Sequence, residues 1–115
     1  IHQPDDLPRM AEATRRMVRD TIDAFLRQDA ETALAVLRQD DEVDALRTRL
    51  VRELIAAMRA DAEAIEAGVA LILVVRSLER IADHATNIAE DVVYILRAEV
   101  VKHRKASLRA PAPGA

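Results

Sequence analysis

Apolar residues recur every three or four positions along most of this chain, and charged residues fill the positions between them. Such spacing puts the apolar side chains on one face of an α-helix, which turns through about 100° per residue. The pattern predicts a first helix over about residues 9–28 and a short helical segment over residues 30–39. A further segment begins near residue 41, and a long final helix covers residues 62–105.

Aspartates stand before three of these segments, where a carboxylate can accept hydrogen bonds from the free amides of a helix start. Asp29 is predicted to cap the second segment, and Asp61 is predicted to cap the final helix. Asp40 or Asp41 is a candidate cap for the segment between them. The middle of the chain therefore forms either two helices or one helix with a kink or break near residues 39–41.

The final helix carries the broadest apolar face of the chain. Its members are Leu71, Val74, Val75, Leu78, Ile81, Ala82, Ala85, Ile88, Ala89, Val92, Ile95 and Leu96. The three alanines in this set would let a partner helix approach closely. Long helices with short connections favour an all-α fold, an antiparallel three-helix bundle with spectrin-like up-down order. Two partner helices need not cover the whole of so long an apolar face, and the uncovered part could serve for dimerisation.

The four prolines all lie near one end of the chain or the other, so residues 9–110 contain none of these helix breakers. Residues 1–8 are interpreted as a linker and residues 9–105 as the helical bundle. Residues 106–115, which end in Pro-Ala-Pro-Gly-Ala, are predicted to be a disordered tail. Because the chain begins with isoleucine, we expect it to be a processed product or part of a longer protein.

Composition narrows the possible function classes. Phe25 and Tyr94 are the only aromatic residues, so the core must be aliphatic. The net charge of −3 argues against a strongly basic nucleic-acid-binding protein. The absence of cysteine excludes disulfides and thiolate chemistry, and it suits a cytoplasmic protein. The longest apolar run, residues 69–75, is far too short to cross a bilayer.

Acidic residues gather on two of the predicted helices, beside or opposite the apolar faces. Glu79 and Asp83 are one helical turn apart, and Asp40 and Asp44 share that spacing earlier in the chain. Like charges so placed repel each other unless a cation lies between them. Four carboxylates from two helices suit a hard cation such as magnesium, calcium or manganese, and bridged carboxylate sites also hold iron or zinc.

Ordinary surface roles compete with this metal hypothesis. Acid pairs one turn apart are common on solvated helix faces, and Arg76 and Arg80 could form surface ion pairs with the acids beside them. A ferritin-like di-iron site would need a histidine three residues after a glutamate on two helices. Neither Glu79 nor Glu90 is followed by a histidine at that spacing, so the ferritin-like signature is missing.

The run from Leu78 to Glu90, Leu-Glu-Arg-Ile-Ala-Asp-His-Ala-Thr-Asn-Ile-Ala-Glu, resembles the signature of the PhoU family, and residues 40–46 resemble the family's other acidic motif. The resemblance covers about residues 9–104 and corresponds to one of two tandem three-helix repeats, most closely the C-terminal one. Ala82 stands where the family commonly has glycine. By position, the resemblance implies metal ligands at Asp40, Asp44, Glu79 and Asp83, with Asn87 and Glu90 as second-tier candidates.

The resemblance also implies a function. PhoU proteins are cytoplasmic regulators that associate peripherally with the membrane and restrain phosphate uptake, acting through the phosphate-specific ABC transporter and the phosphate-sensing histidine kinase. Since only one repeat is present, either the chain is a truncated product or two copies of it pair to restore a six-helix arrangement. We expect a regulatory adaptor rather than an enzyme, because the sequence has no Ser-His-Asp or Cys-His set and no glycine-rich phosphate loop. A metal-storage bundle and a purely structural dimerisation module remain alternatives.

Overall fold

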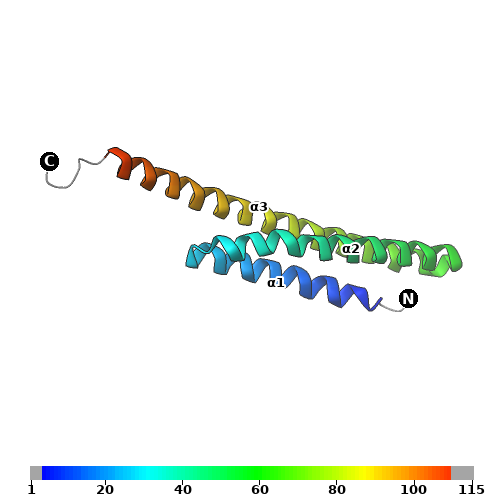
Figure 1. Cartoon of the computed structure of the whole chain (residues 1–115). Helices are drawn as coiled ribbons and strands as arrows, with labels where there is room; N and C mark the ends of the chain where they lie inside the picture. Colours follow the sequence, from blue (N-terminus) through cyan, green and yellow to red (C-terminus); the bar gives the residue numbers. More distant parts are fainter. Residues whose placement is uncertain (1–3, 110–115) are drawn as a thin grey trace.

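The computed structural model describes residues 4–109, and within them the chain forms three helices and no strand. Helix α1 spans Asp6–Arg27, α2 spans Ala30–Ala60, and α3 spans Ile65–Arg109, with a short 3-10 turn, η1, at Ala62–Ala64. Figure 1 shows the three helices lying alongside one another, each running in the opposite direction to the one before it. The predicted all-α three-helix bundle is confirmed.

Both ends of the bundle extend further than the sequence pattern indicated. Helix α1 already begins at Asp6, inside the segment interpreted as a linker, because Pro8 lies in its first turn, where amides have no helical partner. Helix α3 continues through residues 106–109, which were predicted to belong to a disordered tail. Nothing before Pro111 breaks a helix there. Residues 1–3 and 110–115 lie outside the described residues.

The turn between α1 and α2 follows the capping chemistry that the sequence predicts. Gln28 adopts the left-handed conformation, with φ at 54°, and ends α1. The Asp29 carboxylate then accepts hydrogen bonds from the Thr32 amide at 3.2 Å and from the Thr32 hydroxyl at 2.7 Å. These bonds hold the pKa of Asp29 below its ordinary value. Asp29 is therefore the N-cap of α2, as predicted.

Helix α2 passes through residues 39–41 without a break, so the middle of the chain is one helix and not two. Asp40 and Asp41 lie within it and cap nothing. Buried Val36 and Val43, one on each side of these residues, keep the apolar periodicity in phase. Asp61 caps the following segment, accepting the Glu63 amide at 3.0 Å, but it begins η1, so α3 starts at Ile65 rather than Ala62.

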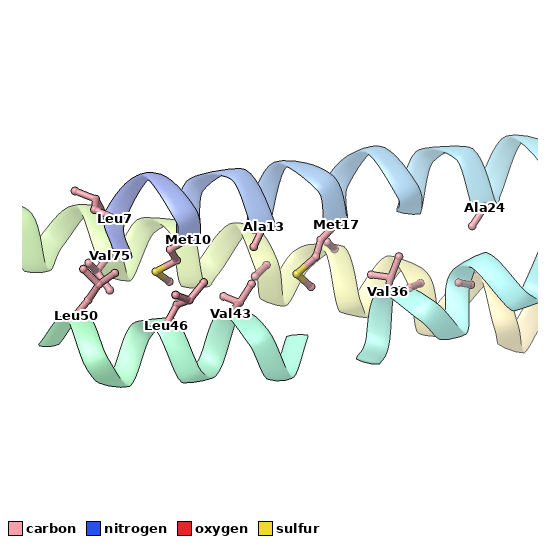
Figure 2. Close-up of a cluster of buried hydrophobic side chains, with 14 of the residues drawn as sticks. Leu7, Met10, Ala13, Met17, Ala24, Val36, Val43, Leu46, Leu50 and Val75 are labelled. Atoms are coloured by element: carbon pink, nitrogen blue, oxygen red, sulfur yellow. The ribbon is translucent and has the colours of Figure 1, made fainter. Parts of the chain in front are cut away.

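The core is aliphatic, and Figure 2 shows its side chains lining the space between the three helices. Its largest fully buried members are Met10, Met17, Val36, Val43, Leu50, Leu54 and Val75. Ala82, Ala85 and Ala89 of α3 are almost completely buried. The Thr21 hydroxyl of α1 donates to the Met17 carbonyl at 2.7 Å and lies 3.4 Å from the Ala85 carbonyl. The predicted close approach at these alanines is confirmed.

The three helices differ in length, and this gives the molecule a free end. They have 22, 31 and 45 residues, and the whole measures 82 × 17 × 16 Å. Beyond the turn between α1 and α2, the C-terminal part of α3 continues alone, without a neighbouring helix (Figure 1). Exposed Val100 and Val101 lie in this part. No helix among the described residues is long and apolar enough to cross a bilayer.

Ala89→Leu tests the alanine contact. Because Ala89 has no exposed surface, the added carbons must displace α1 or α2, and we expect the free energy of unfolding to fall by about 1–3 kcal/mol. The matched control is Ala70→Leu, an exposed position on the same helix, which should change stability by no more than about 0.5 kcal/mol. Urea unfolding followed by circular dichroism measures both. Equal effects at the two positions would show that α3 does not pack through its alanines.

Candidate functional site: an acidic cluster between two helices

Three of the predicted metal ligands come near one another where α2 packs against α3. Asp40 is half-buried on α2, and its pKa is raised above the ordinary value of 3.8. The main cause is loss of water around the carboxyl, and the negative charges of Asp44 and Asp83 add to it. Asp83 lies on the other helix, so the bundle brings the two sequence motifs together. We refer to Asp40, Asp44 and Asp83 as the acidic cluster.

Glu79, the fourth predicted ligand, already has a cationic partner. Arg47 of α2 donates a hydrogen bond from Nη1 to a Glu79 carboxylate oxygen at 2.7 Å, and both side chains are partly shielded from water. This bond is the main reason why the pKa of Arg47 is raised. The sequence suggested Arg76 or Arg80 as partners of the acids, and that expectation is wrong for Glu79. The sequence feature that could have indicated this ion pair is the position of Arg47, about one helical turn after Asp44.

Asn87 and Glu90 lie further along α3 and are exposed. Glu90 lines a separate surface hollow of about 260 Å³, together with Leu37 of α2 and Arg97 of α3. No hydrogen bond or ion pair joins Asn87 or Glu90 to the acidic cluster among the described residues. The structure therefore brings three of the six predicted ligands together, places a fourth beside them in an ion pair, and leaves two apart.

The acidic cluster does not form a finished coordination shell. Within residues 4–109, no group of three or more histidine, cysteine, aspartate or glutamate side chains is arranged to hold a metal ion. The carboxylates are near enough to repel one another but do not converge on one point. A cation there would relieve the repulsion that adds to the effect of burial on the pKa of Asp40, and Glu79 could join only by leaving Arg47. The residue types fit a hard cation, and the side chains would have to turn to receive it.

His84 and the basic patch of α1, the other charged groups noted in the sequence, lie outside the acidic cluster. His84 is exposed on α3 and lines an apolar hollow against α1, about 100° round the helix from Asp83. The basic patch of α1 is largely neutralised by neighbouring acids: Arg15 pairs with Glu12 at 2.6 Å, and Arg16 pairs with Glu42 at 3.4 Å. Neither feature belongs to the acidic cluster.

Comparison with known proteins places the bundle in context. The family model of the PhoU domain matches residues 7–92. A Pseudomonas putida protein named phosphate-specific transport system accessory protein PhoU homolog is 43% identical over 94 residues, which cover 82% of this chain and 37% of that protein. Two further proteins of the same name are similar. The one from Pseudomonas aeruginosa is 45% identical over 77% of this chain and 37% of its own length. The one from Zymomonas mobilis is 43% identical over 82% of this chain and 40% of its own length. The chain thus spans about two fifths of the length of these relatives.

Asp40→Asn tests whether the cluster is electrostatically strained. Because the pKa of Asp40 is higher in the folded chain, the folded state binds more protons than the unfolded state between the two pKa values. Stability therefore falls as the pH rises through that interval, and the cost persists above it. We expect the variant, in chelator, to gain about 0.5 kcal/mol of unfolding free energy at neutral pH. Well below pH 3.8 the gain should vanish.

Glu53→Gln is the matched control, because Glu53 is an exposed carboxylate on the same helix and outside the cluster. Its stability should follow that of the parent chain at both pH values in thermal unfolding. A loss of stability in Asp40→Asn at neutral pH would mean that the Asp40 carboxylate is favourably solvated, and the account of the cluster would then be wrong.

Proposed function

Because the chain belongs to the PhoU family, we propose that it is a regulatory adaptor of phosphate uptake that acts by binding other proteins. The observation that carries this proposal is the extent of the match, which covers α1 from its second residue, all of α2, and α3 as far as residue 92. The relatives are named as accessory proteins of the phosphate-specific transport system. Since the chain covers less than half of each relative, its share of the regulatory activity is part of the proposal.

The partners that we propose are the phosphate-specific ABC transporter and the phosphate-sensing histidine kinase. A narrow bundle with a long free helix offers side surfaces for binding rather than a deep pocket for chemistry. Its one serine with a described side chain, Ser77, is exposed and donates its hydroxyl hydrogen to the Leu73 carbonyl. Such a hydroxyl is not activated by a base, which supports a regulator and not an enzyme. We place the protein in the cytoplasm, in peripheral contact with the membrane where its transporter partner lies.

We further propose that the adaptor binds a divalent or trivalent metal ion at the acidic cluster. Asp40, Asp44 and Asp83 would provide carboxylate oxygens, and Glu79 would join them after releasing Arg47. Asn87 and Glu90 are outer candidates, one and two turns along α3. Oxygen ligands favour magnesium or manganese, and iron or zinc also bind such sites. A bound ion would supply positive charge that holds α2 and α3 together.

A purely structural dimerisation module is the second candidate, because large apolar side chains are exposed along α3. In either role we propose a homo-oligomer, most simply a dimer.

Asp83→Asn separates the two roles: the structural module should keep its stability and its partner binding, whereas the metal-stabilised adaptor should lose part of both. The third candidate, a metal-storage bundle, would need several tightly held ions, and within residues 4–109 no further group of three or more histidine, cysteine, aspartate or glutamate side chains is arranged to hold them.

Metal binding is tested by elemental analysis of the purified chain and by melting curves with and without a chelator. We expect bound metal whose removal lowers the melting temperature. Asp83→Asn should weaken the affinity for manganese by about 10-fold or more. Arg47→Gln should strengthen it, because the competing partner of Glu79 is removed. Glu53→Gln is the control. A purified chain that contains no metal, and whose melting temperature is changed neither by chelator nor by added ions, would contradict the metal site.

The regulatory role is tested in a bacterium that lacks its own PhoU protein. We expect expression of this chain to slow the uptake of labelled phosphate, and the purified chain to bind the transporter or the kinase in a direct assay. The core variant Ala89→Leu, which weakens the fold, should do both less well, whereas Ala70→Leu should behave like the parent. Unchanged uptake together with no binding to either partner would contradict the proposal, whatever the metal content.

A further inference from the structure

The charge of the chain is divided unevenly between the bundle and the C-terminal end of α3. Residues 1–93 contain 12 lysine and arginine residues and 19 aspartate and glutamate residues, whereas residues 94–115 contain five basic residues and one acidic residue. The net charge is therefore −7 in the first part and +4 in the second. Such an asymmetry within one chain is typical of a basic end that meets an anionic partner.

The basic end is also the part of α3 that leaves the bundle. Arg97 still lines a hollow with Leu34 and Leu37 of α2, and beyond it α3 continues alone as far as Arg109 (Figure 1). A helix rises 1.5 Å per residue, so this free end is about 18 Å long. That length exceeds the ~8 Å over which physiological salt screens exposed charges, so the acidic bundle does not cancel the positive field at the tip.

The spacing of its side chains gives the free end one face that is both apolar and basic. Tyr94 and Val101 are 74% and 53% exposed and lie two turns apart on one side of the helix. Arg97 and Arg104 each follow one of this pair by three residues, and Lys105 follows Val101 by four, so the basic side chains border the apolar ones. We call these five residues the basic face.

No carboxylate neutralises the basic face. Within the part of the chain that the structure describes, none of its three basic side chains forms an ion pair. Glu99, the one acid after residue 93, is two residues from Val101 and therefore on the opposite side of the helix. Arg47 and Arg49 of the bundle differ in this respect, because each pairs with an acid of a neighbouring helix. The positive charge of the basic face is thus available to a partner.

The composition of the basic face fits a lipid surface. Arginine and lysine attract anionic headgroups, and their long stems can lie along apolar surface while the charged ends reach phosphate. A tyrosine ring has an apolar body and a polar end, which suits the boundary between headgroups and acyl chains. A convex helix with its charges spread over about three turns matches a fluid array of headgroups better than the fixed charges of one folded protein.

We propose that the basic face binds directly to the anionic lipid headgroups of a membrane surface. This inference rests on the peripheral membrane contact in the proposed function and deepens it, because it assigns a lipid contact to the chain itself as well as to its transporter partner. The free end would rest on the surface at a tilt, with Tyr94 and Val101 at the headgroup boundary. The acidic bundle would be held further from the lipid.

Co-sedimentation of the full chain with lipid vesicles tests the proposal. We expect binding to vesicles of phosphatidylcholine mixed with phosphatidylglycerol, loss of that binding at high salt, and little binding to phosphatidylcholine alone. The triple variant Arg97→Gln, Arg104→Gln, Lys105→Gln should bind the charged vesicles about 100-fold more weakly, at roughly fivefold per basic residue.

The matched control Arg38→Gln, Arg52→Gln, Arg59→Gln removes the same charge from exposed positions of α2, and its affinity should stay within about twofold of the parent's. A parent chain that does not bind the charged vesicles, or equal binding by the two triple variants, would overturn the proposal. So would equal binding of the parent chain to charged and neutral vesicles.

Orientation on the lipid is tested by fluorescence, because the chain has no native tryptophan. On charged vesicles the emission of Val101→Trp should shift to shorter wavelength, whereas that of His103→Trp, on the opposite side of the helix, should not. Equal shifts at the two positions would contradict the basic face. Tight binding to soluble polyglutamate with no shift at either position would indicate an acidic protein partner and also overturn the proposal.

The lipid contact and the regulatory role fail in different ways. A chain that ignores charged vesicles but still slows phosphate uptake would contradict the lipid contact alone. A chain that binds charged vesicles through the basic face without affecting uptake, or binding the transporter or the kinase, would contradict the regulatory role alone.

Discussion

The rotation of α3 about its own axis determines most of what this molecule presents to its surroundings. Ala82, Ala85 and Ala89 point inward because only small side chains let α1 and α2 approach so closely. Once they are inside, helix geometry places Ile81 on one flank and Asp83 on the other. The alanine contact therefore brings Asp83 near Asp40 and, at the same time, leaves a ridge of isoleucines facing solvent.

The sequence predicts the elements that depend on local chemistry. The caps at Asp29 and Asp61 were predictable because a carboxylate before a helix can accept a hydrogen bond from a free amide two or three residues later. The continuity of α2 was not, because Asp40 has the chemistry of a cap, and only the phase of Val36 and Val43 on the two sides of it decides for one helix. Periodicity found the apolar side of α3 but not which half is buried, since neighbours from other helices determine that.

The acidic cluster was predictable in its members but not in its partners. Spacing along one helix indicates that Asp40 and Asp44 are neighbours, and the family resemblance connects them with Asp83. Neither the spacing nor the resemblance shows that Arg47 reaches across from α2 to Glu79, because that contact depends on the register between the two helices. Under the proposed function, a cation that recruits Glu79 would have to compete with the Arg47 guanidinium that already pairs with it.

The most direct test of this account is the titration of the Asp40 carboxyl group, followed by nuclear magnetic resonance in metal-free buffer. If α3 is rotated as described, Asp40 is shielded from water beside Asp44 and Asp83, and its midpoint lies above 3.8. The midpoint should fall when Asp83 is replaced by asparagine. A midpoint at or below 3.8, unchanged by that replacement, would mean that α2 and α3 do not bring these carboxylates together.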